Sequence, residues 1–262
     1  MPQRPKKNKK ANNKKVATDL QSFLQSVYHD TVSLETTCNH RCECCKVAMP
    51  QLNYCEFVQV ITVLWEKLDN NGKLALLLKS LEYFFRNDYK KWSMDSLIKP
   101  CMLLDNEGLC TIYKDRPLNC RMYGLWPKEI YEKRVERFQK AYEPLGLNRK
   151  DLPLHEQCPY VKRVDETVPL TVEVIEGLFS QLDKMDAKLG GFSKLQILQK
   201  ENYRTFHDWL LLKVLGEDWL VKLTAFCMAA SQEVMQSQIE TIQTVWTAKF
   251  TKDGMPDITR AL

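Results

Sequence analysis

Cysteine is the residue type through which this chain could do chemistry, because many of its ten cysteines are clustered. Four thiols lie within the octet Cys38-Asn-His-Arg-Cys42-Glu-Cys44-Cys45. The residues between them are polar, so the octet fits neither a core strand nor the buried face of a helix. One loop can bring several thiolates to one centre at a small entropic cost. We therefore predict that the octet binds metal, as zinc or as an iron–sulfur cluster.

A second pair of thiols flanks a turn. Cys101 and Cys110 lie on either side of residues 105–108, which predict a β-hairpin with a four-residue loop and Leu104 paired with Leu109. In that register both thiols emerge on one side of the hairpin, roughly 7–8 Å apart at Cα. This separation is too long for a relaxed disulfide and suits two metal ligands.

Cys120 is a further candidate ligand, and it lies three residues after Pro117. The proline makes its predecessor extended, which predicts a shaped loop or a helix start at Cys120. Arg116 and Arg121 flank this thiol. They are either ordinary solvated cations or residues that stabilise an anionic thiolate centre from its surroundings.

Cys158 completes the candidate set of ligands and is followed by a proline. Two histidines accompany the thiols: His155 precedes Cys158, and His40 lies inside the octet. Each could bind zinc or donate a hydrogen bond to a ligand. Adjacent residues of an extended chain point in different directions, so one of Cys44 and Cys45 could ligate while the other packs or serves a second centre.

The elements that must position these thiols are predicted to be mainly helical. We expect a mainly α fold with a small irregular, β-hairpin-containing cysteine-rich metal module and a helical C-terminal region. Apolar periodicity predicts helices over 17–28, 53–68, 73–85, 127–142 and 171–189, and a helical run over 205–249 that breaks at Gly216. Cys55 and Cys227 fall within apolar stretches and are predicted to be packed core thiols.

The excess positive charge lies in the first residues. Seven Lys and Arg precede the first acidic residue, Asp19, in a chain of net charge +5. We predict a disordered basic tail over 1–16, a cysteine-cluster domain with a helical insert over 17–165, and a helical region packed on it over 166–262. The tail could solubilise the protein or contact nucleic acid or another acidic surface. With no signal peptide and no stretch apolar enough to cross a membrane, we expect a cytoplasmic protein with no membrane partner.

The thiol groups together resemble a known family. The octet, then Pro-Cys-x-x-Leu, Gly-x-Cys-x-Ile-Tyr and Arg-Pro-x-x-Cys-Arg, is similar to the bacterial YkgJ-like cysteine-cluster (CxxCxxCC) family over roughly 38–160. The family's usual first spacing is Cys-x2-Cys-x2-Cys-Cys, so the second thiol here is displaced by one position. The resemblance implies chelation of zinc or iron, and the family is sometimes labelled an Fe–S cluster oxidoreductase.

Three functions follow as hypotheses. Seven or eight thiols exceed what one structural zinc needs, which favours an iron–sulfur cluster and electron transfer or a redox-linked step, with zinc as the alternative cofactor. A second reading is a zinc-stapled interaction module whose basic tail reaches a protein partner or nucleic acid. A third is a protein-modifying enzyme, because a related cysteine pattern occurs in flagellin lysine-N-methylase. The chain carries no glycine-rich nucleotide or S-adenosylmethionine motif, and the sequence leaves open whether it is an enzyme.

Overall fold

The computed structural model describes residues 8–29, 33–38, 40, 44–46, 49–86, 100–143, 161–189 and 203–258. This part of the chain is mostly helical with one small antiparallel sheet, which confirms the predicted fold class. The helices are α1 Asn8–His29, α2 Tyr54–Lys67, α3 Asn70–Arg86, α5 Leu118–Arg121, α6 Lys128–Tyr142, α7 Val172–Lys188, α9 Phe206–Leu215, α10 Glu217–Ala229 and α11 Gln232–Asp253. Within the described residues, no helix combines the length and the apolar character needed to cross a membrane.

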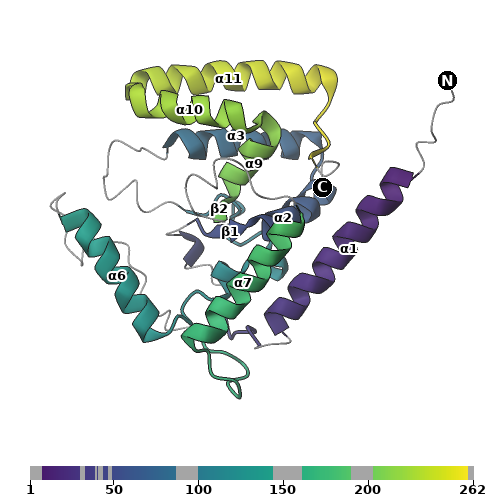
Figure 1. Cartoon of the computed structure of the whole chain (residues 1–262). Helices are drawn as coiled ribbons and strands as arrows, with labels where there is room; N and C mark the ends of the chain where they lie inside the picture. Colours follow the sequence, from purple (N-terminus) through teal and green to yellow (C-terminus); the bar gives the residue numbers. More distant parts are fainter. Residues whose placement is uncertain are drawn as a thin grey trace.

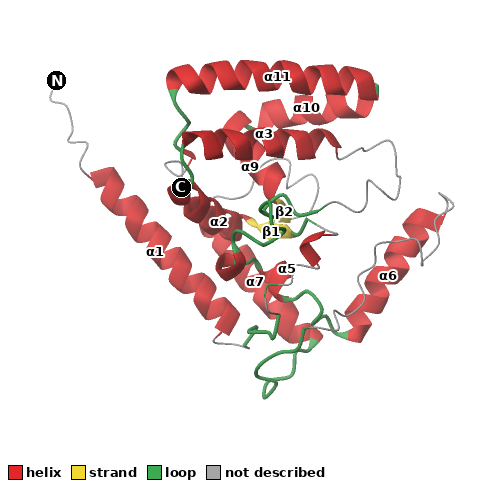
Figure 2. Cartoon of the chain, turned by 180° about the vertical axis from the view of Figure 1, so that it is seen from behind, coloured by secondary structure: helices red, strands yellow, loops and turns green. Residues whose placement is uncertain are grey.

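Helix α2 is the centre of the fold, and it is buried along most of its length. Helices α1 and α7 pack against it on one side, and α3 and α9 form a second packed pair. Figures 1 and 2 show α10 and α11 as the outer layer over α3 and α9, and α6 standing to one side of the body. The apolar stripes read from the sequence therefore face one shared core.

The two-stranded sheet joins distant parts of the chain. β1 (Gln51–Asn53) pairs antiparallel with β2 (Tyr203–Thr205), with Leu52 opposite Arg204. The indole Nε1 of Trp209 in α9 donates a hydrogen bond to the Leu52 carbonyl at 2.9 Å. The segment that follows the octet is thus fixed to the beginning of α9.

Two buried carboxylates fix the beginning of α2. Glu56 accepts hydrogen bonds from the Asn53 amide, the Tyr28 hydroxyl and the Leu118 amide at 3.0, 2.7 and 2.6 Å. Asp186 of α7 accepts from the Tyr54 and Cys55 amides. Burial raises the pKa of both carboxyl groups. These contacts satisfy amide groups that a helix start leaves without a partner, and they tie α1, α2, α5 and α7 together.

Helix α1 begins at Asn8, within the stretch 1–16 that the sequence predicts as a basic tail. The stretch contains Lys and Ala, which favour helix, and it extends a helix anchored by the buried Leu20, Leu24 and Val27. Residues 1–7 lie outside the described part. Contact of the tail with nucleic acid or an acidic surface stays a prediction.

The predicted hairpin register is wrong. Leu104 pairs with Cys110 in a single bridge, not with Leu109, so the loop is one residue longer than predicted. The cause is the Asp105 side chain, whose Oδ1 accepts hydrogen bonds from the Glu107 and Leu109 amides at 2.9 and 2.8 Å. These bonds draw Leu109 into the turn, which closes through Gly108 at φ 77°.

Candidate metal centre

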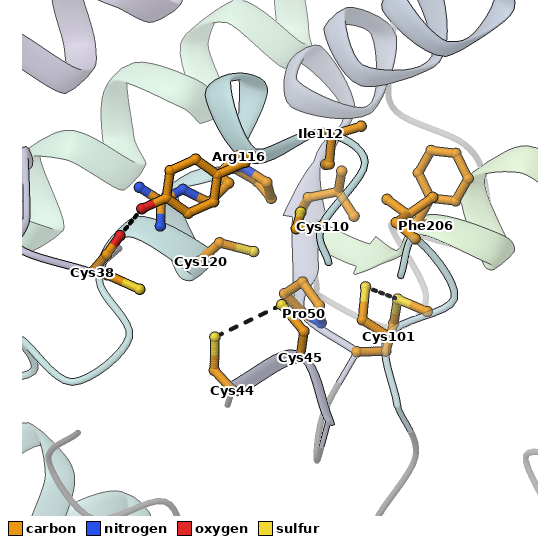
Figure 3. A pocket seen from close by; sticks show the side chains of 15 residues that line it. Cys38, Cys44, Cys45, Pro50, Cys101, Cys110, Ile112, Arg116, Cys120 and Phe206 are labelled. Atoms are coloured by element: carbon orange, nitrogen blue, oxygen red, sulfur yellow. Dashed lines mark hydrogen bonds between the residues drawn. The ribbon is translucent and has the colours of Figure 1, made fainter. Parts of the chain in front are cut away.

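Six of the predicted thiol ligands line one cavity. The cavity has about 560 Å³ of empty space, part of it open to solvent. Figure 3 shows these side chains arriving from separate stretches of the chain around one space. The six are Cys38, Cys44, Cys45, Cys101, Cys110 and Cys120. Three other predicted site residues, Cys42, Cys158 and His155, lie outside the described part of the chain.

Hydrogen bonds to the backbone hold the octet and the second thiol pair together. The Cys101 amide donates to the Cys45 carbonyl. Nε2 of His40 lies 3.1 Å from the Cys110 amide and 3.0 Å from the Cys110 carbonyl, and it accepts from the first or donates to the second according to its tautomer. The Tyr113 hydroxyl donates to the Cys38 carbonyl, and the Tyr113 ring lies 4.2 Å from the His40 ring. His40 therefore positions the backbone of a candidate ligand with the ring nitrogen that could otherwise have bound a metal.

Cys120 is placed by a one-turn helix whose start is fixed at Glu56. Pro117 precedes α5, and the Leu118 amide donates to the buried Glu56 carboxylate. Arg121 lies in the same turn, but it points to the other side of the loop. Its Nε and Nη2 donate to the carbonyls of Arg116 and Lys114, both at 2.8 Å, and its guanidinium lies over the Tyr28 ring. Arg121 thus shapes the loop that carries Cys120 and does not line the thiol cavity.

Arg116 is the cation that faces the thiols. It lines the cavity, with its guanidinium carbon 3.9 Å from the centre of the Tyr113 ring. Its Nε is buried and has no hydrogen-bond partner among the described residues. A buried cation that has a donor without a hydrogen-bond partner, and that lies beside a set of thiols, is placed to offset the negative charge of a thiolate centre.

The six thiols differ in acidity. A hydrogen bond from Cys45 lowers the pKa of Cys110 to about 7, and the Arg116 charge acts in the same direction. Cys45 also lowers the pKa of Cys44, and its own pKa is raised by these two hydrogen bonds. Burial raises the pKa of Cys101 to about 12 and raises that of Cys120 strongly. Cys44 and Cys110 are therefore the thiols most readily deprotonated for metal binding.

We expect the reactivity of Cys110 to follow its low pKa in chelator-treated, reduced protein. With a pKa of about 7, its rate of alkylation by iodoacetamide rises about tenfold from pH 6 to pH 8, since the thiolate is the reacting form. A thiol of ordinary pKa rises close to a hundredfold over the same interval. Peptide mass spectrometry of timed samples measures the rate, with Cys101 as the slow internal control. A hundredfold rise at Cys110 would contradict the assigned hydrogen bond from Cys45.

The donor set fits a thiolate-bound metal. None of the eight described cysteines forms a disulfide. Cys44 Sγ and Cys45 Sγ are in hydrogen-bond contact at 3.8 Å, a separation that two sulfurs bound to one tetrahedral metal at about 2.3 Å can also adopt. Among the described His, Cys, Asp and Glu side chains, however, no group of three or more is placed to hold a metal ion. Metal binding therefore requires the cavity walls to draw inward.

Several cavity residues were not predicted. Met49 and Pro50 follow the octet closely, and a thioether four residues after Cys45 was a signal that the sequence offered. Phe206 comes from α9, and no sequence pattern connects it with the thiols. Cys55 and Cys227 are both buried in the core, away from the cavity lining.

Comparison with protein families identifies the same region. Residues 37–143 match the model of the CxxCxxCC family, whose description is "putative zinc- or iron-chelating domain". The match begins one residue before Cys38, includes all six cavity thiols and ends before Cys158. No curated protein and no solved structure matches the chain.

Proposed function

We propose that the protein holds an iron–sulfur cluster in the six-thiol cavity and transfers electrons, because residues 37–143 match the model of a family described as a "putative zinc- or iron-chelating domain" and six thiols line that cavity. The observation that carries the proposal is the number of thiols that share one space. One structural zinc needs four ligands, and six described thiols exceed that number. When bound, such a cluster supplies electron transfer, at a potential set by its surroundings.

The residues around the thiols have definable tasks in this proposal. The Arg116 guanidinium, with its unpartnered Nε, offsets the negative charge of the thiolates. The hydrogen bond between the His40 ring and the Cys110 backbone holds that ligand against the octet. Apolar walls from Leu52, Leu103 and Phe206 keep water from the sulfurs on one side.

Access to the site also suits electron transfer. Cys38, Cys44 and Cys120 are half-buried, whereas Cys45, Cys101 and Cys110 are buried. One side of the cavity is thus near the surface, where a redox partner can approach. The opposite side is enclosed by the core.

Metal analysis of anaerobically purified protein tests the proposal. We expect iron and acid-labile sulfide, with a broad absorption band at about 400 nm that bleaches on addition of dithionite, from the thiolate-to-iron transitions of such a cluster. A colourless protein with stoichiometric zinc and no iron would replace the redox function with a structural zinc site. Protein that retains neither iron nor zinc under these conditions would contradict metal binding by this cavity.

A further inference from the structure

The thiol cavity contains a seventh sulfur, the thioether of Met49. Met49 lies in the segment that enters β1 and lines the cavity beside the six cysteines. The Cys101 thiol donates a hydrogen bond to the Met49 Sδ at 3.7 Å, drawn as the dashed line at Cys101 in Figure 3.

The spacing of this pair, a hydrogen bond from thiol to thioether in this structure, is compatible with two ligands of one metal. Two sulfurs bound to the same ion at about 2.3 Å in a tetrahedral arrangement lie about 3.8 Å apart. The Met49–Cys101 contact matches that separation as closely as the Cys44–Cys45 contact does. The Cys101 amide is bonded to the Cys45 carbonyl, so its backbone is fixed to the octet. The Met49 thioether is therefore held in contact with the thiol of Cys101, a candidate metal ligand.

The chemistry of the pair selects among metals. A thioether is a soft, neutral donor that carries no proton and adds no charge, so it contributes little to binding Zn²⁺ and much to binding Cu(I). One thiolate and one thioether together carry a single negative charge, which neutralises a monovalent ion. We infer that Met49 is a sulfur ligand of this cavity and that the Met49–Cys101 pair gives the protein a binding position for Cu(I). This inference rests on the metal-binding role proposed above.

A pair of anaerobic competition titrations tests the inference. Cu(I) is titrated against bathocuproine disulfonate, and Zn²⁺ against a chromophoric zinc chelator, for the unaltered protein, Met49→Leu and Met235→Leu. Leucine keeps the volume and apolar character of Met49 and removes only the sulfur. Met235 is a buried methionine of α11 that does not line the cavity, so its replacement is a matched control.

We expect Met49→Leu to weaken Cu(I) binding at least about tenfold and to leave the Zn²⁺ affinity within about twofold, and Met235→Leu to change neither. Unchanged Cu(I) affinity in Met49→Leu, or an equal loss for both ions, would overturn the inference and make Met49 a packing residue. Failure of the unaltered protein to bind Cu(I) would overturn it as well, whereas retained iron or zinc would leave the proposed function intact.

A second measurement needs no variant. In protein made with selenomethionine and loaded with Cu(I), selenium X-ray absorption is expected to show copper in the first coordination shell of a fraction of the selenium atoms. The same protein loaded with Zn²⁺ is expected to show no metal neighbour. Absence of copper around selenium would contradict the inference even if Met49→Leu failed to fold.

Discussion

Replacing Cys120 by serine is expected to lower the metal affinity of the protein at least about tenfold, while replacing Cys227 by serine leaves it unchanged. The Cys120 thiol lines the cavity with five others, and a serine hydroxyl is a poor substitute for a thiolate ligand. Inductively coupled plasma mass spectrometry of the purified variants, with the absorbance of any cluster, measures the difference.

Cys227 is the matched control for this experiment. Its side chain is only 3% exposed and belongs to the core of the α-helical region, so its replacement disturbs packing without touching the cavity. The Cys227→Ser variant is expected to lose about 1–2 kcal/mol of stability, because a hydroxyl is buried in place of a thiol. Equal metal loss in both variants would mean that the thiols have been divided wrongly between ligands and core.

Replacing Glu56 by alanine is expected to lower the free energy of unfolding by about 3–5 kcal/mol. The Glu56 carboxylate is 2% exposed and accepts hydrogen bonds from the Tyr28 hydroxyl and the Asn53 and Leu118 amides. Alanine leaves all three donors buried without this partner. Urea denaturation followed by circular dichroism measures the loss.

The same variant reports on the metal site, because Leu118 lies two residues before Cys120. Loss of the Glu56–Leu118 bond frees the start of α5, so metal affinity is expected to fall together with stability. Glu132→Ala on α6 is the control, since that side chain is 59% exposed and its replacement should change stability by less than about 0.5 kcal/mol. If the Glu56→Ala variant were as stable as Glu132→Ala, the hydrogen bonds to Glu56 would not stabilise the fold.

Much of the fold follows from sequence periodicity. The buried Leu20, Leu24 and Val27 recur at helical spacing, and α9 ends at Gly216, where φ is 82°. The sheet could not be predicted in the same way. Strands of three residues are too short to show alternation, and β1 and β2 lie about 150 residues apart in sequence. Their pairing depends on contacts such as that between Trp209 and Leu52.

The candidate site was predictable as a set of thiols but not as a geometry. Cys101, Cys110 and Cys120 are recognisable by type and spacing, and the structure places them with the octet. The direction of a side chain within a single turn could not be predicted from the sequence. Arg121 is adjacent to Cys120, yet it faces Tyr28 and the loop carbonyls. The predicted hairpin register is wrong because the Asp105 side chain accepts the hydrogen bond of the Leu109 amide, which the predicted pairing of strands assigns to Leu104.

The pairing of β1 with β2 also sets an order of events during biosynthesis. The last thiol of the cavity, at position 120, leaves the ribosome 85 residues before Thr205, the end of the partner strand. At about 5–20 residues per second, this interval is about 4–17 s. During that time the cavity thiols are exposed to oxidants and stray metals, because Phe206, which forms part of the cavity wall, has not yet been translated. A nascent chain of this protein must keep its thiols reduced until the strand that ends at Thr205 has been translated.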